Sequence, residues 1–347
     1  MGRRSDPDWR DAAATELLLR HLPKLNPGGP VLVFGSYRSD LTSWLESRGL
    51  RFEVWNRRCR EGIQGSPWPQ GGPYGTALGR IPRSKDELLM SLHAVASVMG
   101  STGTVALYGA NDEGVKSGAD VLAGLTGEVA TVATGGRCRV VAGRWSSEEG
   151  GDVRGDLSDW KESAPLGPGP FPPDWVSYPG VFAHGRLDEG TRLLLGCLPA
   201  FREGAKVLDY GCGSGVVGWE VSRTSPGAVL SLLDTDAVAL SAARENVPGA
   251  AFLLRDGMPT DEGQMFDAIV SNPPFHRGKG EDPDMLLGFI HDAADRLNSK
   301  GSLVFVAQKR MPLEPPLTSR FRTVDRLGED STFRVWRGRG PLLGHQP

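Results

Sequence analysis

Apolar residues along the first half of the chain alternate between helical spacing and short continuous runs. From residue 11 to residue 25 they recur every three or four positions, which predicts an amphipathic helix. A break of Pro and Gly then precedes the apolar run 31–34, which predicts a buried strand. Further strands are predicted at 51–55 and 104–108, and further helices at 40–47, at 84–99 and from about residue 114. This alternation of strands and helices is typical of an α/β fold.

The second half of the chain repeats the alternation. A helix is predicted at 188–198 and a strand at 206–209. Later strands are predicted at 229–234, 250–254, 266–271, 302–307, 321–327 and 332–337, with helices at 216–223, 237–246 and 285–298. Because the last two strands follow each other directly, we expect a mainly parallel sheet with an antiparallel edge.

A stretch between residues 148 and 173 is rich in Gly, Asp, Ser and Pro and has almost no branched aliphatic residue. Such composition is typical of a linker. A chain of 347 residues also favours two domains over one. We therefore expect one domain at residues 1–165 and a second at residues 166–347.

Composition and charge narrow the class of protein. Hydrophobic residues make up 39% and charged residues 23%, which excludes general disorder, and the 47 Gly and 26 Pro follow no collagen period. No apolar run approaches the roughly 20 residues that span a bilayer, and acids interrupt the amino terminus, so we expect neither membrane span nor signal peptide and a cytoplasmic location. The four cysteines lack metal-site spacing, so we expect reduced thiols and no metal.

The net charge of −3 means that any nucleic-acid contact must come from a local cluster of cations. The densest basic segment interleaves aromatic and basic residues, namely Arg48, Arg51, Phe52, Trp55, Arg57, Arg58 and Arg60. We take this basic segment as the candidate for phosphate contact. The alternative is an ordinary solvated face.

The strongest local motif lies between a predicted strand and a predicted helix, and its functional candidates are Asp209, Gly211, Gly213 and Gly215. Glycines at such a turn let a ligand approach the backbone, and the following helix offers free N–H groups. Residues 213–218 also satisfy the G-x-G-x-x-G dinucleotide pattern. Asp209 would, however, repel a pyrophosphate and attract the ammonium of the methionyl group of S-adenosylmethionine, so a dehydrogenase is a distant alternative.

The next two predicted strands also end in acids. Asp234 is placed to accept hydrogen bonds from ribose hydroxyls, and Asp256 from an adenine amino group. Helix capping or surface solvation is the alternative for both, and for Asp236 the two interpretations are balanced.

The motif Asn272-Pro273-Pro274-Phe275 follows the predicted strand 266–271. If the Asn272 side-chain oxygen and the Pro273 carbonyl both accept N–H bonds from a planar amine, its nitrogen turns pyramidal and its lone pair faces the sulfonium. Phe275 would stack on the target base. A plain surface turn is the alternative. Two interpretations of His276 remain: a catalytic role, or a polar loop residue that shapes the pocket or contacts RNA.

These residues resemble class I S-adenosylmethionine-dependent methyltransferases, and more narrowly the bacterial ribosomal RNA small subunit guanine-N2 methyltransferases with two tandem domains. The resemblance covers residues 173–339 and rests on four segments, at 178–190, 207–215, 272–276 and 333–337. Residues 105–117 are similar to the segment that stands, in the amino-terminal domain of that family, where the catalytic domain has its Asn-Pro-Pro-Phe strand.

The resemblance implies two Rossmann-like methyltransferase domains, the first of them degenerate. Residues 34–37 replace the acid and glycines there, and residues 109–112 replace Asn-Pro-Pro-Phe, so we expect this domain to bind RNA and support its neighbour without catalysis. The implied activity is methylation of the N2 amine of a guanine in ribosomal RNA, 16S in particular. The implied cofactor is S-adenosylmethionine, and the implied partner is ribosomal RNA or the small ribosomal subunit, bound by a monomer.

Other functions remain open at this point. The same Asn-Pro-Pro-Phe motif would serve an adenine-N6 or a protein glutamine-N5 methyltransferase, because it presents two acceptors to any planar amine or amide. A non-catalytic RNA-binding assembly factor with the same fold is a further alternative.

Overall fold

A computed structural model of the chain describes residues 9–60, 62–148, 150–259, 264–273, 276–277, 280–281 and 283–342, with the backbone alone at 276–277 and 280–281. The chain forms two compact units. One consists of Met1–Arg58 and Ile63–Lys161, and the other of Cys59–Gly62 and Glu162–Pro347. Apart from the short segment Cys59–Gly62, the chain passes from one unit to the other between Lys161 and Glu162, within the Gly- and Pro-rich stretch.

The amino-terminal unit is a mixed sheet with helices on both faces. Its strands are β1 (Val31–Phe34), β2 (Phe52–Trp55), β3 (Tyr74–Arg80), β4 (Met99–Ala110), β5 (Val129–Gly135) and β6 (Cys138–Ser146). Its helices are α1 (Trp9–Leu25), α2 (Ser39–Ser47), α3 (Lys85–Ala96) and α4 (Val115–Thr126), with 3-10 turns η1 (Asn111–Glu113) and η2 (Leu157–Trp160). The strand order is β2-β1-β3-β4-β6-β5, and the first four strands are parallel.

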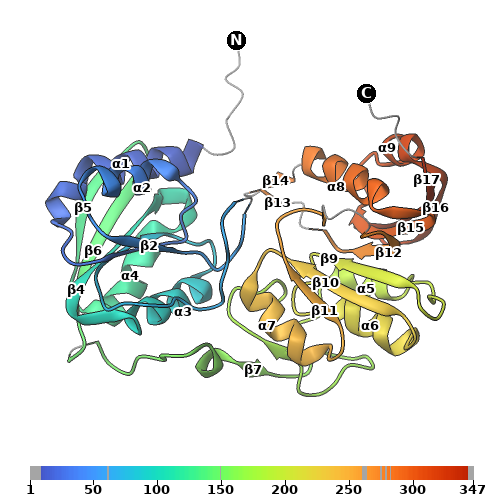
Figure 1. Ribbon diagram of the computed structural model, residues 1–347, viewed down its shortest axis with the longest axis horizontal. Helices are drawn as coiled ribbons and strands as arrows, with labels where there is room; N and C mark the ends of the chain where they lie inside the picture. The colour runs from blue at the N-terminus through green and yellow to red at the C-terminus, as the bar shows by residue number, and fades with distance from the viewer. Residues whose placement is uncertain are drawn as a thin grey trace, which may run out of the picture. The chain divides into compact units, whose positions relative to one another are not determined.

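Two buried cores lie on opposite faces of this sheet. One contains the apolar faces of α1 and α2, and the other those of α3 and α4 (Figure 1). Successive strand residues point to opposite faces, so the fully buried strand β1 contributes to both cores.

The carboxy-terminal unit has the same layers. Its main strands are β9 (Lys206–Tyr210), β10 (Val229–Asp234), β11 (Ala251–Leu254), β12 (Phe266–Ser271), β15 (Leu297–Gln308), β16 (Phe321–Glu329) and β17 (Phe333–Pro341). Short strands β7 (Glu162–Ser163) and β8 (Val176–Ser177) pair with each other, as do β13 (His276–Arg277) and β14 (Gly280–Glu281). The helices are α5 (Glu189–Leu195), α6 (Val216–Thr224), α7 (Ala237–Asn246), α8 (Pro283–Asp295) and α9 (Glu314–Arg320).

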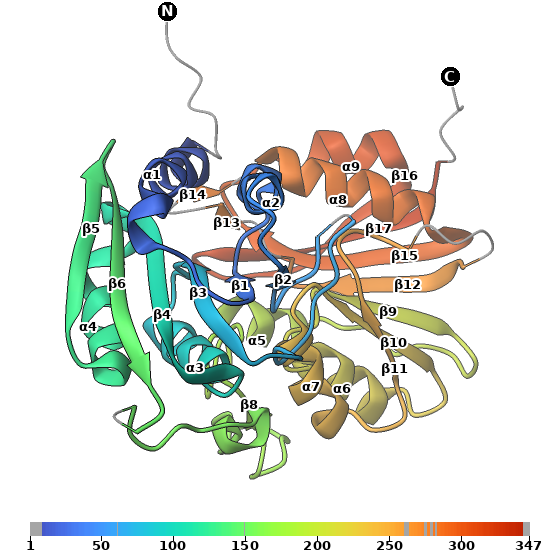
Figure 2. The same cartoon turned by 60° about the vertical axis from the view of Figure 1, so that its left-hand side comes forward.

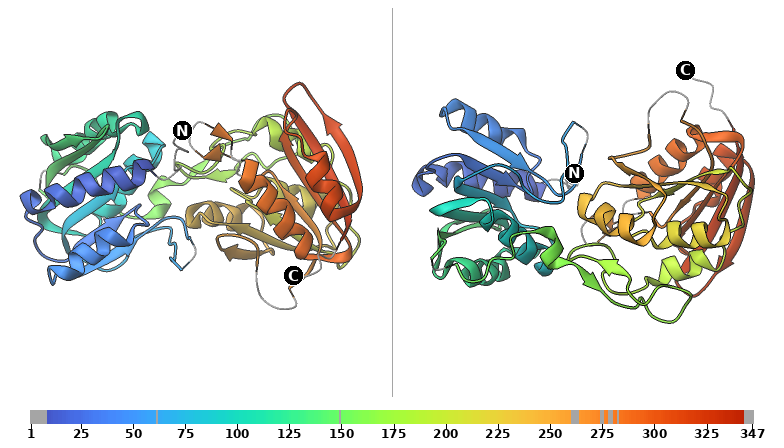
Figure 3. Two further views of the ribbon diagram at one scale, coloured as in Figure 1. Left: turned by 90° about the horizontal axis from the view of Figure 1, so that it is seen from above. Right: turned by 60° about the horizontal axis from the view of Figure 1, so that its bottom comes forward.

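The order of the seven-stranded sheet is β11-β10-β9-β12-β15-β17-β16. Strands β11 to β15 in this order are parallel, and β17 and β16 form the antiparallel edge, as the sequence predicts. Helices α5, α6 and α7 pack on one face and α8 and α9 on the other (Figure 2). The views in Figure 3 show the same layers from two further directions. The expected α/β fold with two Rossmann-like units is confirmed.

The two sheets share one topology, and this corrects one sequence-based expectation. Strand β1 lies between β2 and β3 just as β9 lies between β10 and β12. The counterpart of β12 is therefore β3. Residues 105–117 begin in β4 instead, so their expected match to the Asn-Pro-Pro-Phe strand is wrong. Strand β3 was not predicted, because two glycines interrupt its short apolar run. Gly79 is needed there, since a Cβ would lie 2.0 Å from the ring of Phe34.

The sequence pattern also missed the hairpin of β5 and β6 and the helix α9. Alternating small and polar residues in β5 give it only partial burial, which weakens its apolar signal. Among the described residues no helix is both long and apolar enough to cross a membrane.

Candidate active site

The glycine loop joins β9 to α6 through three residues with positive φ. The φ angles of Gly211, Gly213 and Gly215 are +70°, +55° and +91°, a region that L side chains rarely adopt. The loop is tied to the neighbouring strand because the amides of Gly211 and Cys212 both donate to the carbonyl of Leu233, at 2.8 Å and 3.0 Å. The first turn of α6 therefore begins directly above the ends of β9 and β10.

Asp209 lies beneath this loop and is only 1% exposed. Its Oδ2 accepts a hydrogen bond from the Gly218 amide at 2.9 Å, and its Oδ1 is buried without a partner among the described residues. Burial raises the pKa of Asp209 to about 7. The carboxylate thus ties α6 to the strand, and the expected attraction between Asp209 and the ammonium of a bound S-adenosylmethionine stays a prediction.

Asp234 holds the other side of the glycine loop. Its Oδ2 accepts from the Gly213 amide at 2.8 Å, and its Oδ1 accepts from the Asp236 amide at 2.9 Å. Asp234 is half-buried, and its expected contact with ribose hydroxyls stays a prediction. Asp236 caps α7 by accepting from the Val238 amide at 3.0 Å, which favours the capping interpretation of this residue.

Asp256 is exposed just after β11, and its contact with an adenine amino group stays a prediction. Asp234 and Asp256 follow neighbouring parallel strands. The carboxyl ends of parallel strands lie at one edge of a sheet, which is the usual position of nucleotide sites in this fold.

Asn272 follows β12, and its side-chain amide is held by two hydrogen bonds. Nδ2 donates to Oδ2 of Asp188 at 3.0 Å and to Oγ1 of Thr191 at 2.8 Å. Because a carboxylate can only accept, the nitrogen must face Asp188 and the carbonyl oxygen must face away from it. Within the described part of the chain nothing donates to Oδ1 of Asn272, so this oxygen is available to a substrate N–H.

Asp188 and Thr191 are site residues whose role the sequence pattern did not reveal. Asp188 caps α5 by accepting from the Thr191 amide at 2.9 Å, so one carboxylate both starts the helix and orients Asn272. Asp188 lies within the segment 178–190 that carries the family resemblance, and that was the available signal. Contact with Asn272, 84 positions away, depends on the tertiary fold.

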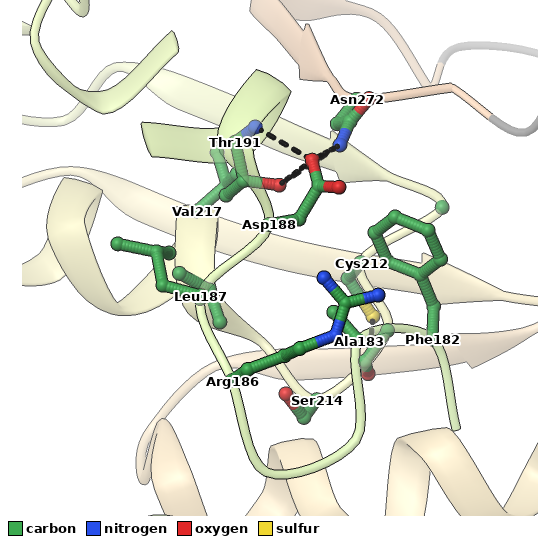
Figure 4. Close-up of a pocket in the computed structure, with 13 residues that line it drawn as sticks. Phe182, Ala183, Arg186, Leu187, Asp188, Thr191, Cys212, Ser214, Val217 and Asn272 are labelled. Carbon is green, nitrogen blue, oxygen red and sulfur yellow. Dashed lines mark hydrogen bonds between the residues drawn. The ribbon is translucent and has the colours of Figure 1, made fainter. Parts of the chain in front are cut away.

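A pocket lies between Asn272 and the glycine loop (Figure 4). It is lined by the glycine loop, by the first turn of α6, by Asn272 and by the segment before α5, namely Phe182, Ala183, Arg186, Leu187, Asp188, Thr191, Gly211, Cys212, Gly213, Ser214, Val216, Val217 and Asn272. A Cβ at Gly213 would meet nothing within 4 Å, which shows open space above the loop backbone. The open loop beside Asp234 fits an adenosine-containing cofactor.

The structure describes the first two residues of the predicted catalytic motif Asn-Pro-Pro-Phe. Pro273 is buried directly after Asn272. Pro274 and Phe275 lie outside the described residues, as does the side chain of His276, so stacking by Phe275 stays a prediction. All four cysteines are free thiols, and the described residues contain no cluster that could hold a metal ion.

The basic segment of the amino-terminal unit is not the uniform phosphate-binding face that the sequence suggested. Arg57 is only 6% exposed, and the Arg58 guanidinium pairs with Glu87 at 2.5 Å. Arg48 is exposed and lies over the ring of Trp44 at 5.3 Å. Arg57 therefore offers little surface to a phosphate, and phosphate contact by the exposed Arg48 stays a prediction.

The amino-terminal unit has an ion pair where the other unit has Asn272. Counting along β3 and β12 from the pairs Val31–Thr76 and Val207–Ala268 places Arg80 at the position of Asn272. The Arg80 side chain is 10% exposed and pairs with Asp11 at 2.9 Å and with Glu113 at 2.7 Å. A guanidinium has no acceptor oxygen, so this position cannot accept a substrate N–H.

Comparisons with known proteins agree with this geometry. Residues 174–337 match the model of the methyltransferase small domain. The chain is 31% identical over 261 residues to ribosomal RNA small subunit methyltransferase C of Hahella chejuensis, covering 74% of this chain and 75% of the relative. It is 30% identical over 338 residues to the protein of that name from Stutzerimonas stutzeri, covering 93% of this chain and 98% of the relative. The chain belongs to the ribosomal RNA small subunit methyltransferase C family.

A solved structure supports the fold. A T. thermophilus 16S rRNA N2 G1207 methyltransferase in complex with AdoMet and guanosine matches with a TM-score of 0.77, covering 94% of this chain and 91% of that chain. Sequence identity is 23%, so this likeness concerns the fold. Membership of the methyltransferase C family confirms the resemblance carried by the four sequence segments.

Proposed function

We propose that this member of the methyltransferase C family transfers a methyl group from S-adenosylmethionine to the exocyclic N2 amine of a guanine in 16S ribosomal RNA. The observation that carries the proposal is the fixed orientation of the Asn272 amide. Both of its N–H groups are occupied by Asp188 and Thr191, so its carbonyl oxygen is presented as an acceptor.

The chemistry follows from the properties of a planar amine. The lone pair of the guanine N2 nitrogen is delocalised into the ring, so the nitrogen is a poor nucleophile until its geometry changes. Acceptance of its N–H groups by Oδ1 of Asn272 and by the carbonyl of Pro273 favours a pyramidal nitrogen and stabilises the positive charge that develops on it. S-adenosylmethionine, when bound, supplies an electrophilic methyl group on a sulfonium. As the N–C bond forms, the S–C bond breaks, and the product amine then loses a proton to solvent.

The cofactor site is proposed along the carboxyl edge of the sheet. Asp234 would take the ribose, Asp256 the adenine amino group, and the pocket-lining backbone at Gly211 and Gly213 the body of the cofactor. Gly215 and Asp209 would act through the loop itself, because Gly215 precedes α6 and Asp209 binds the Gly218 amide.

Guanine is favoured over adenine or glutamine by the relatives. Their names specify the small-subunit ribosomal RNA, and the T. thermophilus protein of similar fold is a methyltransferase for N2 of a guanine, G1207. The described Asn272 geometry by itself would serve any planar amine or amide. Ribosomal RNA or the small subunit is accordingly the proposed partner, with a monomer as the acting form.

The amino-terminal unit is proposed to bind RNA without catalysis. Its Arg80 ion pairs occupy the place of Asn272, and Val33, which is 1% exposed, occupies the place of Asp209. Neither the acceptor oxygen nor the buried acid of the carboxy-terminal unit is therefore available there.

The test is methyl transfer to small ribosomal subunits from a strain that lacks the endogenous enzyme, with modified nucleosides identified by mass spectrometry. We expect N2-methylguanosine with the natural protein. With Asn272→Ala we expect turnover to fall by roughly 10²-fold while S-adenosylhomocysteine affinity stays unchanged. N6-methyladenosine as the product, or a near-normal rate for the variant, would contradict the proposal.

A further inference from the structure

Two side chains of opposite charge line the cavity beside Asn272. They are Arg186 and Asp188, two positions apart in the segment before α5. A turn brings them there, because the Arg186 amide donates to the carbonyl of Ala183 at 3.0 Å and Ala183 adopts a φ of +52°. Figure 4 shows the Arg186 guanidinium reaching into the space framed by Phe182, Ala183 and Cys212.

Arg186 has no acidic partner among the residues that the structure describes. Its side chain is exposed and makes neither an ion pair nor a hydrogen bond with them. Other arginines of the same unit are paired, such as Arg334 with Glu329 at 2.7 Å and Arg337 with Asp325 at 2.9 Å. An unpaired guanidinium on a cavity wall is suited to bind a carboxylate in two parallel hydrogen bonds.

The carboxylate of Asp188 uses only one of its oxygens within the protein. Oδ2 accepts from the Thr191 amide at 2.9 Å, from the Thr191 hydroxyl at 3.3 Å and from Asn272 at 3.0 Å. Oδ1 accepts nothing from any described residue. The cavity therefore offers a free anionic oxygen as well as a free cation.

The position of the cavity identifies the part of the cofactor that it would hold. Asp234 and Asp256, proposed to bind ribose and adenine, do not line it, whereas Asn272, proposed to hold the target amine, does. The group on the far side of the sulfonium from the adenosine is an α-amino acid, with one ammonium and one carboxylate. These charges complement Asp188 and Arg186.

We propose that Arg186 binds the α-carboxylate of S-adenosylmethionine and S-adenosylhomocysteine, while Oδ1 of Asp188 accepts from the α-ammonium. This inference rests on the proposed function. It gives Asp188 two tasks, since one oxygen orients Asn272 and the other meets the cofactor. The spacing of methyl donor and target amine would then depend on a single carboxylate.

The test compares two ligands that differ only in the carboxylate. These are S-adenosylhomocysteine and its decarboxylated analogue S-adenosyl-3-thiopropylamine, titrated calorimetrically into the full-length chain. We expect Arg186→Met to weaken binding of S-adenosylhomocysteine by roughly tenfold or more, the scale of a lost charged hydrogen bond. Binding of the analogue should change by less than about twofold, because it cannot make that bond.

Matched variants complete the design. Arg192→Met makes the same chemical change at an exposed arginine of α5 outside the cavity lining, and it should leave both affinities unchanged. Arg186→Gln is a second neutral variant that should reproduce the selective loss. Circular dichroism confirms that each variant is folded.

Three results would overturn the inference. The Arg186 variants could bind S-adenosylhomocysteine with unchanged affinity, they could weaken both ligands equally, or they could lose affinity for 16S ribosomal RNA alone, which would assign this cation to a phosphate. Failure of the natural protein to bind S-adenosylhomocysteine is a different result, because it would contradict the proposed cofactor itself.

Discussion

At the scale of single residues, the site depends on which atoms are already occupied. The Asn272 amide has both N–H groups bound, Asp188 has one oxygen bound and one open, and Asp209 is buried with one oxygen bound. Function is therefore assigned to the atoms that remain, since a hydrogen-bonding group already paired inside the protein is not available to a ligand. Two predictions belong to this scale.

The first concerns Thr191, whose hydroxyl accepts from Nδ2 of Asn272 at 2.8 Å. Thr191→Val keeps the volume but removes the acceptor, so the Asn272 amide is less firmly oriented. We expect kcat to fall by about tenfold, since a 1.4 kcal/mol loss of positioning corresponds to that factor. S-adenosylhomocysteine affinity, measured by calorimetry, should be unchanged. Thr191→Ser keeps the hydroxyl and should restore most of the rate, and equal defects in the two variants would disprove a positioning role.

The second concerns Asp209, whose pKa burial raises to about 7 from the ordinary 3.8. Between these values the folded state holds a proton that the unfolded chain releases, so stability falls as pH rises through that window and stays reduced above it. Asp209→Asn removes the titration and keeps an acceptor for the Gly218 amide. We expect the Tm of the variant to gain on that of the natural protein between about pH 4 and about pH 7. A Tm difference that is independent of pH would refute the prediction.

At the scale of elements, the strand-to-helix turn after β9 sets the geometry of the site. Its glycines meet different surroundings. A Cβ at Gly215 would lie 2.8 Å from Cγ2 of Val247, whereas a Cβ at Gly213 would meet nothing within 4 Å. Gly215 is therefore needed for packing against α7, and Gly213 for the open space above the backbone.

This difference predicts opposite outcomes for two alanine variants. Gly213→Ala should cost only about 1 kcal/mol of stability, the strain of one left-handed residue, yet it should weaken S-adenosylhomocysteine binding because the methyl group enters the cavity. Gly215→Ala should cost more, because its φ of +91° and its close contact both oppose a side chain. Urea unfolding and calorimetry on both variants provide the measurements. A larger stability loss for Gly213→Ala would contradict this assignment.

At the scale of the whole molecule, one topology occurs twice with different chemistry. The order of the first sheet, β2-β1-β3-β4-β6-β5, corresponds strand by strand to β10-β9-β12-β15-β17-β16 of the second sheet. In the amino-terminal unit the site positions hold Val33 and the ion-paired Arg80, which stabilise the unit from within. The proposed RNA affinity of this unit must then come from exposed cations.

The arginines of the basic segment differ in exposure, and this difference predicts which of them affect stability and which affect RNA binding. Arg57→Ala should lower the Tm of the protein, because the residue is only 6% exposed. The exposed pair Arg48→Ala and Arg51→Ala should leave the Tm unchanged and weaken RNA binding. Each lost phosphate contact should reduce the slope of log K against log salt by about one unit. Filter binding across a salt series measures the slope, and an unchanged slope in the double variant would place the RNA contact elsewhere.

The sequence by itself determined the class of fold, the parallel sheet with its antiparallel edge, the glycine loop and the Asn272 motif. These features are local, because apolar period and turn chemistry report on neighbouring positions in the chain. It could not determine that Asp188 and Thr191 hold Asn272, that Asp209 is buried and tied to α6, or that Arg57 is only 6% exposed. It also missed β3, and so matched the wrong strand of the first unit to the catalytic motif. Such pairings join residues tens of positions apart, and only the packing of helices on the sheet decides which polar atoms meet and which remain open.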